Sequence, residues 1–96
     1  MPTYVVLANL TQQGIQAAKE IPERRAAAKD AAKALGITWR ESWLTMGQYD
    51  VVVILDAPDD ETIARFALQM GMRGNVSTQT LRAFSEAESD AVIGSL

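Results

Sequence analysis

TYVVLANL (residues 3–10) and DVVVILDA (residues 50–57) are apolar on both of their alternating faces. Side chains in a β-strand point alternately to opposite faces of the sheet, so a strand that is apolar on both faces needs cover above and below. Both stretches are short and rich in β-branched residues, which favours strands over helices. They therefore predict two strands in the centre of one sheet, and TQQG (residues 11–14) is expected to break the first of them.

The segment between these stretches has the pattern of a helix followed by a strand. Residues 15–20 are expected to form a helical turn or two, which Pro22 interrupts, and residues 23–35 are rich in strong helix formers. Gly36 is a natural C-terminal stop for this helix. Residues 37–46 then mix polar and apolar side chains, as expected for a strand at the edge of a sheet.

The C-terminal part of the chain predicts a helix, a strand and a short final helix. Asp59 is a good N-cap, and Gly74 ends the helix that follows. That helix carries one apolar stripe at helical spacing, made of Ile63, Phe66, Ala67 and Met70. Residues 75–84 read as the fourth strand. Ser85 and Glu88 then form a capping box for a short helix that ends near Gly94.

The predicted order of elements is βαββαβ, in a single domain over residues 1–96. In the ferredoxin-like arrangement the sheet order is 4-1-3-2, which puts strands one and three in the centre. Those are the two strands that are apolar on both faces. We therefore expect an α+β fold with a four-stranded antiparallel sheet. Two helices cover only one face, so a second copy of the chain is the simplest cover for the other, in a homodimer or higher homo-oligomer.

The composition limits the chemistry open to the chain. It contains neither cysteine nor histidine, which excludes thiolate nucleophiles, disulfides, the usual catalytic triads and the usual zinc ligands. A net charge of −3 and a pI of about 4.8 argue against a nucleic-acid partner.

The apolar N-terminal stretch is too short to span a bilayer, so we expect a cytoplasmic protein without membrane contact. No cofactor is expected. No metal site is expected either, because the acids at 56–61 fit no calcium loop.

GQYD, residues 47–50, joins the second and third predicted strands. The structural interpretation is a hairpin turn in which Gly47 supplies an unusual φ, Asp50 accepts from backbone donors and the Tyr49 ring packs at the end of the sheet. The functional interpretation places the Tyr49 hydroxyl and the Asp50 carboxylate at a pocket mouth, where they would orient a ligand. We favour the structural role for Asp50, while Tyr49 can pack and still offer its hydroxyl.

Several other side chains are candidates for ligand contact. Lys19 and Arg24 flank the break at Pro22 and form either a solvated helix face or a patch that recognises an anion. Trp39 and Trp43 are expected on one face of the edge strand. There they pack at a subunit contact or, alternatively, form a stacking wall for an aromatic ligand.

Asn75 begins a polar run that continues to Thr80. This run is either an exposed edge of the sheet or the lining of a cleft. The candidate ligand-binding residues are therefore Lys19, Arg24, Trp43, Tyr49, Asp50 and Asn75.

The chain resembles the GYD domain family, which is named for a Gly-x-Tyr-Asp turn. Blocks similar to the family run through nearly the whole chain: TQQGI at 11–15, PERR at 22–25, TMGQYDVVVILDAPDDE at 45–61 and GNVSTQTLRAF at 74–84. The resemblance implies a ferredoxin-like fold of the dimeric α/β-barrel type and no established activity. Relatives often carry paired aromatic residues before the turn, whereas this chain has Trp43 and Leu44 there.

Two classes of function are compatible with these features. The first is a non-catalytic homo-oligomeric domain that binds a small molecule or a protein partner; the missing histidine and cysteine and the surplus apolar sheet surface favour it. The alternative is an enzyme that resembles the dimeric-barrel monooxygenases or isomerases and acts on a small organic substrate, which is an analogy of fold alone. An enclosed cavity with Tyr49 or Asp50 pointing into it would favour the enzyme.

Overall fold

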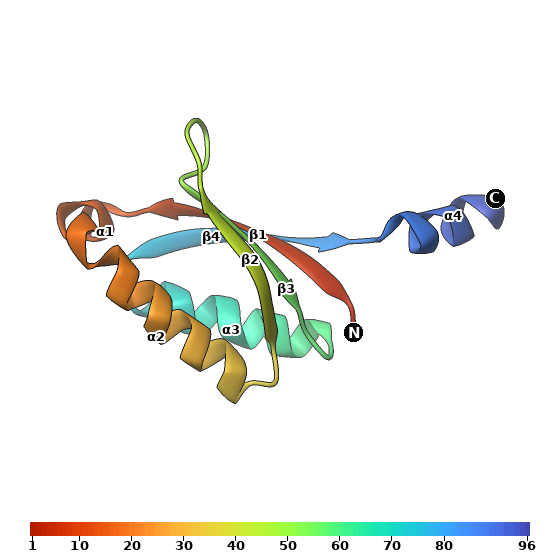
Figure 1. The fold of residues 1–96 in the computed structure, drawn as a ribbon, viewed down its shortest axis with the longest axis horizontal. Helices are drawn as coiled ribbons and strands as arrows, with labels where there is room; N and C mark the ends of the chain where they lie inside the picture. The colour runs from red at the N-terminus through yellow and green to blue at the C-terminus, as the bar shows by residue number, and fades with distance from the viewer.

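The four strands form one antiparallel sheet in the computed structural model, which describes residues 1–96 (Figure 1). Along the chain the elements are β1 (Thr3–Leu10), α1 (Gln12–Gln16), the 3₁₀ turn η1 (Ala18–Glu20), α2 (Ile21–Ala34), β2 (Thr38–Leu44), β3 (Val51–Asp56), α3 (Asp60–Met72), β4 (Val76–Ala83) and α4 (Glu86–Gly94). The predicted α+β class and the antiparallel sheet of four strands are confirmed.

The strands lie across the sheet in the order β2-β3-β1-β4. Read from the β4 edge, the same sheet runs β4-β1-β3-β2, so the two numberings describe one arrangement. In either direction β1 and β3 are the central strands, as their doubly apolar patterns predict. Val6 of β1 illustrates the register, since it pairs with Val53 on one side and Thr80 on the other.

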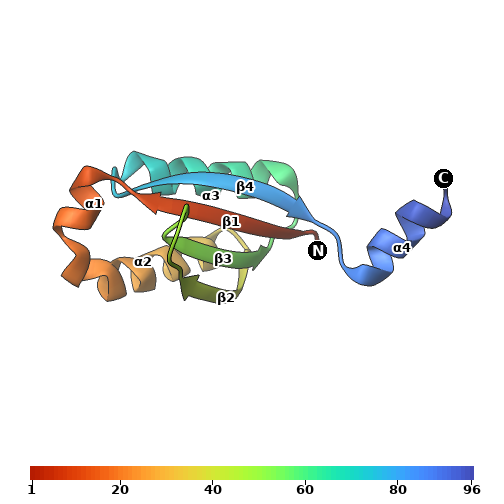
Figure 2. The same ribbon diagram turned by 90° about the horizontal axis from the view of Figure 1, so that it is seen from above.

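The core lies between one face of the sheet and the helices α2 and α3, which cover the same side (Figures 1 and 2). Its buried side chains come from all these layers: Tyr4, Val6, Ala32, Ile37, Val53, Leu55, Ala57, Ile63 and Phe66. Ala32 is fully buried, which shows how a small side chain lets α2 lie close to the sheet. The predicted stripe of α3 is confirmed, because Ile63 and Phe66 are buried and Met70 packs against the core.

The opposite face of the sheet has no helix over it (Figures 1 and 2). We call it the open face; its apolar side chains are Val5 and Leu7 of β1, Val52 and Ile54 of β3, and Leu81 of β4. All five remain partly or largely exposed to solvent. In β1 and β3 one face is therefore buried under the helices, and the other face, which is similarly apolar, is uncovered.

Helix formation starts earlier than the sequence suggests. The expected break of the strand at residues 11–14 is confirmed, because β1 ends at Leu10, but the helix expected from residue 15 already begins at Gln12. Thr11 caps α1 by accepting a hydrogen bond from the backbone N–H of Gly14. Glycine is a poor helix former, but here it occupies a site with no room for a side chain, as described below. Pro22 lies in the first turn of α2, where its missing N–H has no helical partner to lose.

The edge strand contains a bulge that the sequence pattern did not reveal. The register of β2 against β3 shifts between Trp39 and Glu41, so Arg40 is an extra residue and the alternation of faces inverts there. Trp39 pairs with a buried residue and packs against the core, whereas Trp43 pairs with Val52 of the open face. The prediction that the two tryptophans share one face is therefore wrong.

The C-terminal helix α4 projects from the body of the protein along its longest dimension of 48 Å (Figure 2). Its predicted capping box is confirmed: the Ser85 hydroxyl accepts from the Glu88 N–H, and the Glu88 carboxylate accepts from the Ser85 N–H. None of the helices combines the length and hydrophobicity needed to cross a membrane.

Candidate functional site

The hairpin between β2 and β3 is built by short hydrogen bonds around Gly47. The Thr45 N–H donates to the Asp50 carbonyl oxygen at 2.8 Å, and the Thr45 hydroxyl donates to the Tyr49 carbonyl oxygen at 2.6 Å. Gly47 has a φ of +119°, which side-chain-bearing residues rarely adopt. The predicted reason for glycine at this position is confirmed.

Asp50 connects this hairpin to the end of the central strand β1. Its carboxylate Oδ2 accepts a hydrogen bond of 2.9 Å from the backbone N–H of Leu10, and its own N–H donates to the Ala8 carbonyl oxygen at 2.9 Å. A carboxylate that accepts from a backbone N–H makes a charge-assisted bond, which is stronger than a neutral one. These contacts support the structural interpretation of Asp50.

Tyr49 reaches across the sheet. Its hydroxyl donates to the side-chain oxygen of Gln79 at 2.6 Å. Gln79 belongs to β4 and pairs with Leu7 of β1. Tyr49 lies just before β3, which begins at Val51. Because β1 lies between β3 and β4, the tyrosine spans β1 and ties the hairpin to the far edge strand.

Asn75 lies on the other side of the β1 end. Its carbonyl oxygen accepts from the Thr11 N–H at 3.0 Å, and its side-chain oxygen accepts from the Gln13 amide at 3.0 Å. A Cβ built on Gly14 would lie 2.1 Å from the same carbonyl oxygen, so only glycine lets α1 come this close to β4. The consecutive N–H groups of Leu10 and Thr11 are thus satisfied by Asp50 and Asn75.

Arg24 and Lys19 differ in their surroundings. The Arg24 guanidinium donates to the Gly14 carbonyl oxygen at 3.0 Å and so joins α2 to the α1 turn beside Asn75. Lys19 is exposed and forms neither an ion pair nor a hydrogen bond through its side chain. The structure therefore brings Arg24, Asn75, Tyr49 and Asp50 to one end of the sheet, and leaves Lys19 outside these contacts.

This end of the sheet is organised by bonds within the chain. The Tyr49 hydroxyl and the Oδ2 atom of Asp50 make the hydrogen bonds described above, and no buried side-chain polar atom lacks a partner. Tyr49 and Asp50 line neither of the two main grooves on the molecule. No group of three acidic side chains is placed to hold a metal ion. The arrangement holds the hairpin in one position.

The hairpin carries exposed apolar side chains beyond these bonds. Met46 is 99% exposed, Leu44 is 78% exposed, and Trp43 is about half exposed on the open face. The hairpin extends away from the side of the sheet that the helices cover (Figure 1). We call Leu44 and Met46 the hairpin tip. A tip of this kind is an apolar surface presented on a backbone that is already ordered.

A groove at the β2 edge was not anticipated from the sequence. We call it the edge groove; it lies between α2 and β2, and its lining residues are Lys29, Lys33, Ile37, Trp39, Arg40, Glu41, Ser42 and Trp43. The Lys29 ammonium lies 5.7 Å from the centre of the Trp39 ring. The i, i+4 spacing of Lys29 and Lys33 predicts one basic face on the helix, but only the tertiary structure shows that this face lies beside Trp39.

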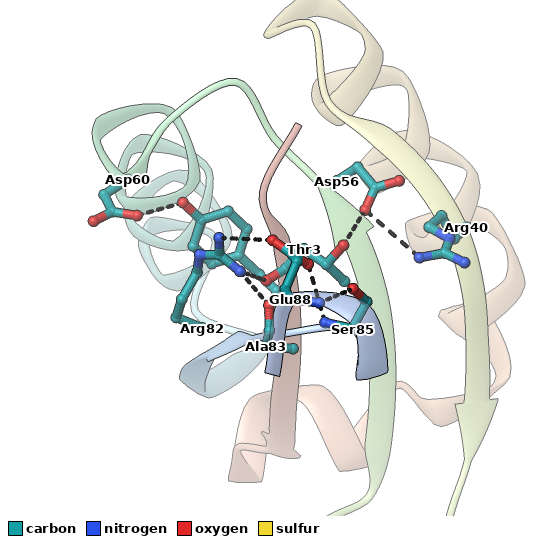
Figure 3. A network of polar contacts seen from close by, with 9 residues as sticks. Thr3, Arg40, Asp56, Asp60, Arg82, Ala83, Ser85 and Glu88 are labelled. Atoms are coloured by element: carbon teal, nitrogen blue, oxygen red, sulfur yellow. Dashed lines mark hydrogen bonds and ion pairs between the residues drawn. The ribbon is translucent and has the colours of Figure 1, made fainter. Parts of the chain in front are cut away.

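A polar network at the opposite end of the sheet was also missed (Figure 3). The hydroxyl of the buried Tyr4 donates to the Asp60 carboxylate. Burial is the main reason, and this hydrogen bond the second, why the pKa of Tyr4 is raised to about 12. Arg82 lies over the rings of Tyr4 and Phe84 and pairs with Glu88 at 3.7 Å. The signal in the sequence was a tyrosine on a buried face, whose hydroxyl needs a partner.

These features define a small α+β domain in which internal hydrogen bonds hold one end of the sheet, while an apolar sheet face and a hairpin tip stay uncovered. The family model described as "GYD domain" matches residues 4–93. The chain belongs to the GYD domain family.

A relative from Thermus thermophilus is named "Glutamine synthetase and cystathionine beta-lyase binding protein". The two sequences are 34% identical over 89 residues, which is 92% of this chain and 94% of the relative. No solved structure matches the chain.

Proposed function

We propose that this chain is a non-catalytic, homo-oligomeric binding protein whose partners are proteins. By similarity to the named Thermus relative, its partners are a glutamine synthetase, a cystathionine beta-lyase or both from its own organism. The observation that carries this proposal is the hairpin tip. Leu44, the last residue of β2, and Met46, in the loop that follows, are exposed on a hairpin that Asp50, Thr45 and Tyr49 hold by hydrogen bonds. A preordered apolar loop loses little conformational entropy when a partner binds it.

The homo-oligomer is proposed from the open face. Five apolar side chains from three strands face solvent there with no helix above them. Contiguous apolar surface of this kind is typical of contacts between proteins. A second copy that presents the same face would cover it symmetrically, in a dimer of the α/β-barrel type, with the exposed half of Trp43 at its border. A cytoplasmic location also stays a prediction.

The enzyme alternative has weaker support from the geometry. An enzyme of this type is expected to have Tyr49 or Asp50 facing a cavity. Here both side chains make hydrogen bonds within the chain, and neither lines one of the two main grooves. A small-molecule ligand remains compatible with the basic edge groove.

Capture of the two enzymes tests the protein-binding proposal. The purified chain is immobilised, and glutamine synthetase and cystathionine beta-lyase from the same organism are passed over it separately. We expect at least one to bind, and we expect Met46→Asp to weaken that binding by about tenfold or more, as loss of an interface anchor does. Met72→Asp is the matched control, because Met72 is 85% exposed at the far end of α3. Failure of both enzymes to bind, or equal effects of the two variants, would contradict the proposal.

The oligomeric state tests the open face. We expect light scattering to give the mass of a dimer or larger assembly, and Leu81→Asp to reduce it to that of a monomer, because a carboxylate would be buried without a partner. Leu68→Asp is the control, since Leu68 is an exposed leucine on the outer side of α3. A parent protein that is monomeric at micromolar concentration would refute the assembly.

A further inference from the structure

The C-terminal helix α4 has no packing partner in its own chain. Val92 and Ile93 are exposed, and Leu96 at the terminus is 100% exposed. Outside its capping box, its side-chain contact with the body is the ion pair between Glu88 and Arg82. A helix of nine residues is marginal in water by itself, so most of the stability of α4 has to come from a surface that it contacts.

The charges of α4 are all negative. Its acids are Glu86, Glu88 and Asp90, and it carries no lysine or arginine. Glu88 is used by Arg82 and by the cap, which leaves Glu86 and Asp90 without an ion pair. These two residues are four apart, and Ile93 follows at the next helical position, so the three lie along one face. That face presents two carboxylates followed by an apolar side chain.

The edge groove offers the complementary pattern. Lys29 and Lys33 are also four residues apart on one helix, and neither forms an ion pair. The apolar part of the groove beside the lysines is the Trp39 ring, whose centre lies 5.7 Å from the Lys29 ammonium. Trp43 also lines the groove, from the open-face side of the β2 edge. On both helices the two charges are separated by about 6 Å along the axis, from the 1.5 Å rise per residue. Because the two spacings match, both carboxylates of α4 can pair with the two lysines of α2 at the same time.

We propose that α4 of one copy docks in the edge groove of a second copy, with Glu86 and Asp90 on Lys29 and Lys33 and with Ile93 against Trp39. The edge groove lies at the β2 edge of the sheet, whereas α4 follows β4, which is the opposite edge. For this reason we assign the groove that α4 enters to a second copy. Figure 2 shows α4 beyond the end of β4 and far from α2, the helix that supplies the lysines of the edge groove. In a two-fold dimer the contact occurs twice, once for each arm.

This exchange of arms does not depend on binding of the two enzymes. The capture assay above measures a third protein on the hairpin tip, whereas the experiments below measure contacts between identical chains. Either proposal can therefore fail while the other stands.

Disulfide trapping tests the contact directly, because the chain contains no cysteine of its own. Lys33→Cys in one chain is mixed with Glu86→Cys or Asp90→Cys in a second chain that carries a mass tag, and the mixture is oxidised. We expect the mixed covalent dimer in at least one of the two mixtures, about tenfold above the control pair in which Lys19→Cys replaces Lys33→Cys. Lys19 is an exposed lysine outside the groove. A yield no greater than that of the control would overturn the proposal.

Cysteines in the same chain distinguish the two ways of reaching the groove. The double variants Lys33→Cys with Glu86→Cys and Lys33→Cys with Asp90→Cys should give covalent dimers. A covalently closed monomer at high dilution would show that each arm reaches its own groove, and would overturn docking on a second copy.

Charge exchange between chains gives an independent readout. The variant Lys29→Glu/Lys33→Glu and the variant Glu86→Lys/Asp90→Lys should each associate with themselves about tenfold more weakly than the parent, because each places like charges together. An equimolar mixture should recover the affinity of the parent, since both groove–arm contacts are then between opposite charges. Lys19→Glu/Arg25→Glu controls for net charge. Absence of recovery in the mixture would overturn the proposed pairing, and a fall in affinity as large in the control would do the same.

Discussion

The β2–β3 hairpin and the C-terminal arm both leave the sheet and both expose apolar side chains, but the chain holds them in different ways. The hairpin is tied to the body by Asp50 at Leu10 and by Tyr49 at Gln79, over separations of 40 and 30 residues. The arm is held mainly by local bonds, the capping box and the pair of Glu88 with Arg82.

The hairpin and the arm present their apolar surfaces in two different ways. Long-range hydrogen bonds order the hairpin before any partner arrives, so its tip can bind without a change of shape. Local bonds give the arm a helical start, but they connect it to the body through one ion pair, so in our proposal a second copy supplies its remaining contacts. The following changes test whether the hairpin end is indeed the rigid one.

Gly14→Ala should have the largest effect. The new Cβ would lie 2.1 Å from the Asn75 carbonyl oxygen, and two backbones have to separate to relieve the overlap. We expect a loss of about 3 kcal/mol in the free energy of unfolding, measured in urea. Gly71→Ala is the control: no atom lies within 4 Å of its Cβ, so it should be neutral or gain up to about 1 kcal/mol. Equal stability of the two variants would show that the α1–β4 contact can relax.

Asp50→Asn should have the next largest effect. The bond from the Leu10 N–H loses its charge, which we expect to cost about 1 kcal/mol in the same unfolding measurement. Asp30→Asn, which changes an exposed acid on α2, should be silent. If Asp50→Asn unfolds like the parent protein but no longer captures the enzymes, the turn is a functional site and its structural interpretation is wrong.

Tyr49→Phe should have a smaller effect. The ring stays and only an exposed hydrogen bond to Gln79 is lost, for which we expect about 0.5 kcal/mol. Enzyme capture should not change, because the hydroxyl is not part of the hairpin tip. Capture that is lost in a variant with unchanged unfolding would place the tyrosine hydroxyl in the binding surface.

Acid should weaken the caps of both α4 and α3. Hydrogen bonds from Ser85 hold the pKa of Glu88 below its ordinary value of 4.5, so the Glu88 part of the capping box stabilises α4 at neutral pH and is lost as the pH falls through this lowered pKa. Hydrogen bonds from Thr62 lower the pKa of Asp59 from 3.8 in the same sense, so the α3 cap is also lost in acid. The amide NMR signals of Ser85 and Thr62 should report the two losses separately. Glu88→Gln should abolish only the change at Ser85.

Much of the fold could be read from local patterns. The central position of β1 and β3 follows from their doubly apolar alternation, and the caps at Asp59 and Ser85 follow from side chains that bond to N–H groups three residues away. Such contacts depend on a few neighbouring residues, so their partners are visible in the sequence. Of the candidate site, the roles of Gly47 and Asp50 in the hairpin were predicted, but the partner of Asp50 was not.

The amino-acid sequence by itself determined which strands are central, where the later helices begin, and that no thiolate or imidazole is available. The tertiary structure alone decided that Arg40 is a bulge residue that separates the faces of Trp39 and Trp43, and that Gly14 lies against Asn75. It also decided that the arm leaves the body. The physical reason is range: alternation and capping act over a few residues, whereas register and close backbone approach depend on partners that only the folded sheet brings together.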